Sequence, residues 1–376
     1  MERGGERKLM KSCALKVFII VASMSGIVKA GPYNEPGING YVGPGGKATA
    51  PSDPNAVINP IFRGWARAVA SYAPAPGVSS DWQNPLKALG PATGDIYDIV
   101  SLGDLSQTQI NQGVPAGQIT LIFGDPCVPN DPNHIRNGNG YDFAVFENGF
   151  ASGFTNQYYG FVAGEVFADL GYVEVSSDGV HFVRFPSVSL TKGRVGAYGT
   201  VDITNIYNLG GKHPNGYGLC MGTPFDLSEL EVEPMVQSGV VDINNIAYVR
   251  IVDIPGSGDF KDEATQYVDP CSWPNWDYYD ANHPIYDAWL TYGSGGFDLE
   301  AIGVLRPQQY RGDINLDGTV NFVDFAILAG AWQKRFGQTG WIARCDISSP
   351  EDLVVDILDF ATLAEDWLKV EQWHKN

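Results

Sequence analysis

Short runs of apolar residues separated by turn residues dominate the chain from about residue 98 to residue 302. Runs of four to six residues rich in Val, Ile, Tyr and Phe, bounded by Gly, Pro, Asn or Asp, are typical of β-strands. Asp178-Gly179 between two such runs indicates a tight hairpin, because Gly tolerates positive φ. We therefore expect a mainly β fold, a β-sandwich, with strands over 98–102, 118–123, 141–146, 172–175, 181–185, 247–252 and 297–302.

Two stretches have a helical period instead. Residues 61–72 predict a short helix with Trp65 and Val69 turned inward. Near the C-terminus, apolar residues at i, i+3, i+4 and i+7 predict a helix that ends at Gly337. Its apolar face consists of Phe325, Leu328, Ala329 and Trp332.

The loop before that C-terminal helix has the spacing of calcium ligands. Ca²⁺ takes six to eight oxygen ligands, and alternate side chains of a loop converge on one ion only if the sixth position turns sharply, as Gly318 allows. The twelfth position is Asp324, where the EF-hand pattern has the longer Glu. The predicted ligands are Asp313, Asn315, Asp317, Thr319 through its backbone carbonyl, Asn321 and Asp324.

This loop and helix are repeated. The segment from Asp324 to Trp332 returns 35 residues later as the segment from Asp359 to Trp367. The second loop is two residues longer and contains Pro350, so its ligand assignments are provisional. They are Asp346, Ser348, Asp352, Asp356 and Asp359.

Two calcium loops, each followed by a helix, resemble a type I dockerin module over residues 312–370. The resemblance implies docking to a cohesin-like partner protein. Partner choice in that family lies at loop positions 10 and 11, which here are Phe322-Val323 and Ile357-Leu358. The alternative is that calcium only staples a small helical pair that cannot otherwise bury a core.

The N-terminus predicts secretion. Lys8 and Lys11 precede an apolar run that ends in Val28-Lys29-Ala30, the pattern of a signal peptide over 1–30. No other long apolar stretch follows, so we expect no membrane insertion and a protein that is secreted, extracellular or at the cell surface. The remaining chain divides into a β-sandwich domain over 31–306 and a calcium-binding domain over 307–376.

Composition narrows the choice of partners. The formal net charge is −19, which argues against nucleic acid and anionic membrane surfaces. Only 18% of residues are charged, beside 45 glycines and 24 prolines, a composition typical of β-rich proteins with many turns. Segments such as 140–148, 173–179 and 296–302 resemble secreted bacterial cell-surface proteins. That resemblance implies a jelly-roll domain of the discoidin or galactose-binding kind.

Export also makes disulfides possible for the four cysteines beyond the signal. We expect at least one disulfide among them. Cys127 and Cys271 are the first candidates, because both lie in turns bordered by Pro. The four residues are Cys127, Cys220, Cys271 and Cys345.

Candidate chemistry in the β-rich part is sparse, and none of the usual catalytic motifs occurs. An aromatic segment beside Asp and Asn suits a sugar ring, although its aromatics could equally anchor their own loop. Acidic residues at strand ends could cap strands, hold calcium, or work as an acid and base pair. The predicted glycan-binding residues are Trp273, Trp276, Tyr278 and Tyr279, and the acidic candidates are Asp142, Glu147, Asp253, Asp287, Asp298 and Glu300.

These observations favour a non-catalytic extracellular protein that binds carbohydrate or serves adhesion and carries a calcium-dependent docking module. No residue is assigned a catalytic role. The alternative function is a secreted glycoside hydrolase that degrades polysaccharide with paired carboxylates.

Overall fold

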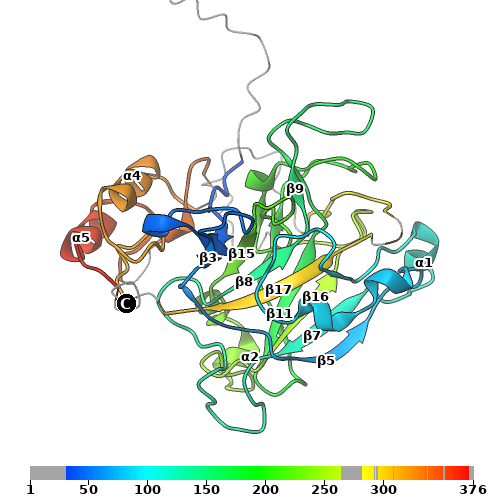
Figure 1. The fold of residues 1–376 in the computed structure, drawn as a ribbon, viewed down its shortest axis with the longest axis horizontal. Helices are drawn as coiled ribbons and strands as arrows, with labels where there is room; N and C mark the ends of the chain where they lie inside the picture. The colour runs from blue at the N-terminus through cyan, green and yellow to red at the C-terminus, as the bar shows by residue number, and fades with distance from the viewer. Residues whose placement is uncertain are drawn as a thin grey trace, which may run out of the picture.

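The computed structural model describes residues 31–263, 282–291, 293, 295–307, 309–336, 338–349 and 352–371. The described chain is mainly β and contains several antiparallel sheets, which confirms the predicted fold class at that level (Figure 1). None of its helices is long and apolar enough to span a membrane.

One large sheet has five strands. Its order is β12 (Val183–Arg184), β11 (Gly171–Ser176), β16 (Tyr248–Asp253), β7 (Gln118–Ile122) and β5 (Ala68–Ala73). Along β16 the side chains alternate between buried and half-buried, as expected of a strand with one face toward a core.

The second large sheet has six strands. Its order is β1 (Ile38–Asn39), β15 (Met221–Phe225), β8 (Phe143–Glu147), β17 (Asp298–Leu305) and β4 (Phe62–Trp65), and β6 (Val100–Ser101) also pairs with β17. Every residue of β8 and β17 is buried. Both faces of this sheet are therefore covered, which explains why these strands are apolar almost throughout.

The two sheets pack face to face. Val145 and Leu299 of the six-stranded sheet share one hydrophobic cluster with Leu121, Val173 and Val249 of the five-stranded sheet. The other face of the six-stranded sheet carries a second cluster, in which Phe62 stacks on Trp65 with ring centroids 4.8 Å apart.

Shorter elements surround these sheets. Three two-stranded pairs are β2 (Tyr41–Val42) with β3 (Val57–Ile58), β9 (Phe150–Ala151) with β10 (Val166–Phe167), and β13 (Val188–Ser189) with β14 (Ile206–Tyr207). The short helices are α1 (Gln107–Asn111) and α2 (Pro234–Gln237). Turns of 3₁₀ helix lie at Pro44–Gly46, Ser80–Trp82, Pro85–Ala88, Ile203–Asn205, Leu227–Leu230 and Ala343–Cys345.

All seven predicted strands contain β-structure, but three local predictions are wrong. The predicted helix over 61–72 is the whole of β4 and most of β5, joined by Ala66 and Arg67, because its apolar residues also fit strand alternation next to two available sheet edges. The Asp178-Gly179 hairpin is wider than a two-residue turn, since Val175 pairs with Val183. Asp178 instead supports a longer loop by accepting hydrogen bonds from the amides of Val180 and His181.

The third correction concerns the C-terminal helices, α4 (Phe322–Gly330) and α5 (Ile357–Glu365). The predicted apolar face of α4 is only partly buried: Leu328 is fully buried, whereas Phe325 and Trp332 are exposed. The helix also ends seven residues before Gly337. Its inner face packs into a cluster that includes Tyr33 and Tyr207, so the C-terminal segment shares its core with residues from the β-rich part (Figure 1).

Candidate functional site

The first C-terminal loop wraps around two buried aspartates. Asp313 accepts hydrogen bonds from the amides of Asp317 at 3.1 Å and Gly318 at 2.9 Å. Asp324 accepts from the amide of Asn315 at 3.1 Å, and it also caps α4 by accepting from the amide of Asn321 at 2.8 Å. The sequence folds this way because an Asn at the N-cap and an acidic residue three positions later satisfy free amides at a helix start.

Negative charge is concentrated in this loop. Burial, together with the carboxylates of Asp324 and Asp317, raises the pKa of Asp313 to about 8. Burial also raises the pKa of Asp324. Gly318, with φ of +87°, provides the sharp turn that the sequence predicted there. A cation would relieve the repulsion among these three carboxylates.

The second loop reproduces these hydrogen bonds. Asp346 accepts from the amide of Leu353 at 2.7 Å, as Asp313 does from that of Gly318. Asp359 accepts from the amide of Ser348 at 2.8 Å and from that of Asp356 at 2.7 Å, where it caps α5. The two extra residues around Pro350 therefore leave the backbone pattern of the loop intact.

Each loop is completed by the chain that follows the other helix. In the first loop, Val320 donates to the carbonyl of Lys369 and accepts from the amide of Leu368, both at 3.0 Å. In the second, Val355 donates to the carbonyl of Lys334 at 2.9 Å and accepts from the amide of Gln333 at 2.7 Å. Both pairs of bonds are related by a shift of 35 residues, so the sequence repeat corresponds to a two-fold arrangement of the backbone.

The predicted ligand residues are thus gathered in two loops. Within the described ranges, no group of three or more His, Cys, Asp or Glu side chains is arranged to hold a metal ion. The carboxylates bind loop amides instead, and Asn315 donates to Asp317 at 2.9 Å. The carbonyl of Thr319 accepts from the Asn321 side chain at 3.0 Å. Asp352 accepts from the amide of Val354 at 3.0 Å.

An exposed apolar surface lies at the start of both helices. Phe322 and Val323 of α4 are 75% and 51% exposed, and Ile357 and Leu358 of α5 are 61% and 54% exposed. Across the pair, the rings of Phe325 and Phe360 meet edge to face, with centroids 6.1 Å apart. We call the residues Phe322, Val323, Phe325, Ile357, Leu358 and Phe360 the helix-start surface.

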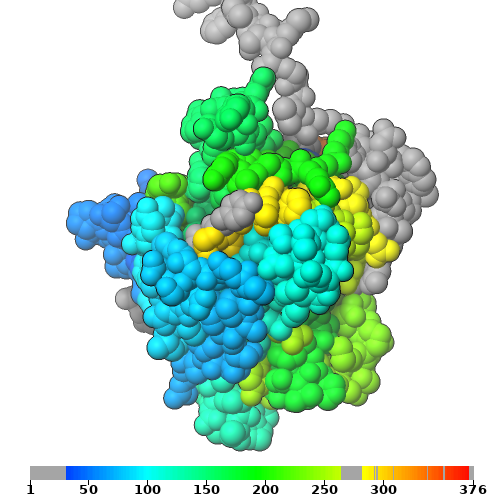
Figure 2. Space-filling view, turned by 90° about the vertical axis from the view of Figure 1, so that its right-hand side faces the viewer, coloured from blue at the N-terminus to red at the C-terminus, as the bar shows by residue number. Residues whose placement is uncertain are grey.

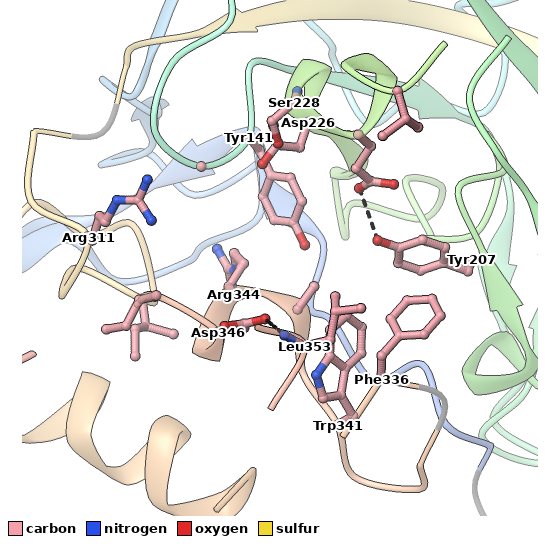
Figure 3. Close-up of a pocket in the computed structure, with 16 residues that line it drawn as sticks. Tyr141, Tyr207, Asp226, Ser228, Arg311, Phe336, Trp341, Arg344, Asp346 and Leu353 are labelled. Atoms are coloured by element: carbon pink, nitrogen blue, oxygen red, sulfur yellow. Dashed lines mark hydrogen bonds between the residues drawn. The ribbon is translucent and has the colours of Figure 1, made fainter. Parts of the chain in front are cut away.

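A cavity of about 360 Å³ lies between the second loop and the β-rich part. Figure 3 shows Tyr141 and Tyr207 on one side of it and Arg344 and Trp341 on the other. The guanidinium of Arg344 lies 5.5 Å from the centre of the Tyr141 ring, and the Tyr207 hydroxyl donates to Glu229 at 3.0 Å. Sequence reasoning missed this cavity, because its two walls are at least 79 residues apart in the chain.

The candidate acidic residues of the β-rich part divide into two groups. Asp142 accepts from the amides of Gly138 and Leu227, and Glu300 from the amides of Thr93 and Gly94, so both tie loops to strands. The others lie near one another, because each raises the pKa of at least one neighbour. They are Glu147, Asp253, Asp287 and Asp298, joined by Asp104 and Asp169, which sequence reasoning missed.

Several predictions fall outside the described residues: the signal peptide over 1–30, Cys271 and the aromatic residues Trp273, Trp276, Tyr278 and Tyr279. The predicted pairing of Cys127 is wrong, since Cys127, Cys220 and Cys345 are free thiols. Cys220 and Cys345 are buried in hydrophobic clusters, where a thiol packs as a small apolar group.

Comparison with protein-family models gives no match for this chain, and neither do comparisons with curated proteins or with solved structures.

Proposed function

We propose that residues 307–376 form a calcium-dependent docking module carried by a secreted or cell-surface protein. The observation that carries this proposal is the matched hydrogen-bonding of the two loops, in which an aspartate at position 1 and another at the helix cap accept the same loop amides 35 residues apart. Each loop holds several carboxylates close together, and their repulsion destabilises the folded state unless a cation is bound.

Residues of both loops fit a hard cation. Their side chains offer only oxygen ligands, which suit Ca²⁺ and are poor ligands for softer metals. Asp324 and Asp317 raise the pKa of Asp313, and Asp317 also raises that of Asp324, so a bound cation would stabilise the ionised forms of Asp313 and Asp324. Each carboxylate has more than one acceptor site, so it can keep its loop amide and still bind the ion. The first loop would use Asp313, Asn315, Asp317, Thr319, Asn321 and Asp324, and the second Asp346, Ser348, Asp352, Asp356 and Asp359.

The helix-start surface suits a protein partner. It is apolar, exposed and held next to both loops, so ordering of the loops by calcium would also order this surface. A cohesin-like domain is the partner that the resemblance to dockerins implies. Exposed apolar patches of this kind commonly mark sites of protein association.

For the β-rich part we infer a jelly-roll connectivity. Among eight central strands, one sheet has the order β6-β17-β8-β15 and the other β7-β16-β11-β12. In each sheet, strands from the beginning of the chain lie next to strands from its end. This is the strand order that two Greek-key motifs produce. We propose that this part binds an extracellular glycan without catalysis, supported by its many exposed tyrosine and phenylalanine side chains.

Calorimetric titration of the full mature chain with calcium, after treatment with a chelator, tests the docking proposal. We expect binding at both loops and a rise in melting temperature on loading. The double variant Asp313→Ala with Asp346→Ala should lose this response, whereas Asp53→Ala, which removes a half-buried aspartate outside the loops, should keep it. A chain that melts at the same temperature in calcium and in chelator would refute the proposal.

A further inference from the structure

A second cavity opens on the β-rich part, far from the C-terminal loops in sequence. It measures about 270 Å³ and combines an aromatic wall with an acidic floor. Figure 2 views this side of the molecule, where the yellow segment after residue 282 lies between green segments above and a cyan segment below. We call it the aromatic cavity. Its wall includes Trp82, Tyr97, Phe150 and Tyr198, and its floor includes Asp169 and Asp298.

The aromatic wall is built from separate loops. Trp82 and Tyr97 stack with centroids 6.1 Å apart and planes 21° apart. Phe150 meets the exposed Tyr217 edge to face at 5.1 Å. Tyr97 and Tyr198 are 63% and 59% exposed, so their rings are available at the mouth of the cavity.

The floor holds carboxylate oxygens that lack partners. Asp169 is only 5% exposed, and its Oδ1 has no hydrogen-bond partner among the described residues. Glu147 does not line the cavity but acts on Asp169 electrostatically; it is 1% exposed, and within the described ranges its Oε1 also lacks a partner, while its Oε2 accepts from the amide of Gly149 at 2.9 Å. Asp298 accepts from the side-chain amide of Asn148 at 3.1 Å. A buried acceptor without a donor is costly, so an unpaired oxygen that lines a cavity points to a ligand donor.

Several other carboxylates surround Asp169. Burial raises its pKa, and the carboxylates of Asp287, Glu147, Asp298 and Asp104 raise it further. Among the described residues, no Lys or Arg forms an ion pair with any of these five carboxylates.

Two lysines of the β-rich part form contacts away from the acidic floor of the cavity. Lys87 lies 5.7 Å from the Trp82 ring and donates to the Tyr97 carbonyl. Lys212 pairs with Glu35. Neither cation lines the aromatic cavity.

We propose that the aromatic cavity binds an organic ammonium group carried on a single ring or a short chain, such as the amine of an amino sugar. The ammonium would lie against Asp169 and Asp298, and the apolar face of its carrier against the aromatic wall. An ammonium donates three hydrogen bonds and compensates buried negative charge, which a neutral sugar cannot do. Aromatic rings add attraction for cations. A metal ion fits less well, because the aromatic side chains of the wall would pack against an organic carrier, which a bare metal ion lacks.

The size of the cavity restricts the ligand. It lies just below the range of about 300–1,000 Å³ that is common for small-molecule sites, which suits one sugar ring or one alkylamine. This inference goes beyond the docking role and does not depend on it. It would also give the proposed glycan binding a site within the described chain.

Calorimetric titration of the full mature chain tests it with four probes: glucosamine, N-acetylglucosamine, glucose and cadaverine. We expect glucosamine to bind at least about tenfold more tightly than N-acetylglucosamine and glucose, since a hydrogen bond to a charged group contributes about 1.5–3 kcal/mol. Stronger binding of glucosamine than of cadaverine would identify an amino sugar, and the reverse an alkylamine. Equal binding of all three sugars, or no binding of either amine, would overturn the proposal.

Variants separate a binding role from a structural one. Asp169→Asn should remove amine binding while raising the melting temperature, because it relieves repulsion in the empty cluster. Tyr97→Ala should weaken binding severalfold, whereas Tyr158→Ala, a tyrosine 86% exposed and outside the cavity, should not. A lower melting temperature for Asp169→Asn together with unchanged amine affinity would overturn the proposal. If Asp169→Asn abolishes calcium binding while Asp313→Ala leaves it intact, the aromatic cavity is a metal site and the amine proposal is wrong.

Discussion

Leu353 occupies in the second loop the place that Gly318 occupies in the first, and both have positive φ, +61° and +87°. Each donates its amide to the aspartate that opens its loop, at 2.7 Å from Leu353 and 2.9 Å from Gly318. Glycine adopts this conformation without penalty, whereas a side chain at Cβ is strained there.

Leu353→Gly should therefore stabilise the protein, by about 1 kcal/mol, because it removes the strain and deletes a side chain that is 52% exposed. Urea unfolding followed by fluorescence measures the change. The matched control is Leu358→Gly, a similarly exposed leucine inside α5, which should destabilise by about 1 kcal/mol. If both variants lose the same amount of stability, the backbone of Leu353 is not strained.

Calcium dependence should differ between loop positions. Asp324→Ala should reduce the calcium-induced rise in melting temperature more than Asp352→Ala does. Asp324 is fully buried and both caps α4 and holds Asn315, whereas Asp352 is exposed. Differential scanning calorimetry in calcium and in chelator provides the comparison. A larger effect from Asp352→Ala would contradict the assignment of Asp324 as a ligand.

Substitutions in the helix-start surface should weaken docking without changing the stability of the folded protein. Phe322→Ser combined with Ile357→Ser should weaken binding to a recombinant type I cohesin domain by at least about tenfold, because exposed apolar anchors dominate such interfaces. The melting temperature should change little, since both side chains are mostly exposed. Val180→Ser, a 75% exposed valine in the β-rich part, serves as the control. If the unaltered chain does not bind the cohesin domain in calcium, the partner assignment is wrong.

Stability should fall as pH rises through neutrality. Burial raises the pKa of Asp298 to about 8, well above the ordinary value of about 4 for an unfolded aspartate. The folded state therefore binds more protons than the unfolded state between these values, so the free energy of unfolding decreases as pH rises from about 4 to 8. Asp298→Asn should flatten this dependence, with a difference on the order of 2 kcal/mol at pH 8. Melting temperatures from pH 5 to 8 in chelator test it, and identical slopes would contradict it.

Sequence reasoning found the elements whose signals are local. The strand runs depend on patterns within a few positions, and the repeat of 35 residues is a direct match between two short segments. Both reappear in the structure. Residues 61–72 were misjudged because a period of 3.6 and an alternating pattern overlap in short segments. Whether such a segment becomes a helix or a strand depends on a free sheet edge, which the local sequence does not encode.

The sites that were missed depend on contacts between distant segments. Asp169 has no local motif, and only the fold brings it beside Asp298, 129 positions later. The burial of Leu328 rather than Phe325 follows from packing against a cluster that contains Tyr33, almost 300 residues earlier. Spacing identified the right helix and its buried Leu328, but Phe325 and Trp332 on the same predicted face are exposed.

The exchange of backbone bonds between the two loops has a consequence for how the chain is made. Val320 in the first loop donates to the carbonyl of Lys369 and accepts from the amide of Leu368, both of which are synthesised almost fifty residues later. Chains generally fold in the order in which they emerge, but here the earlier loop must wait for the later helix to arrive. The first loop therefore stays unfinished while its own helix is already complete on the ribosome. If the chain is secreted as we propose, the loop would be completed only after the whole segment has crossed the membrane.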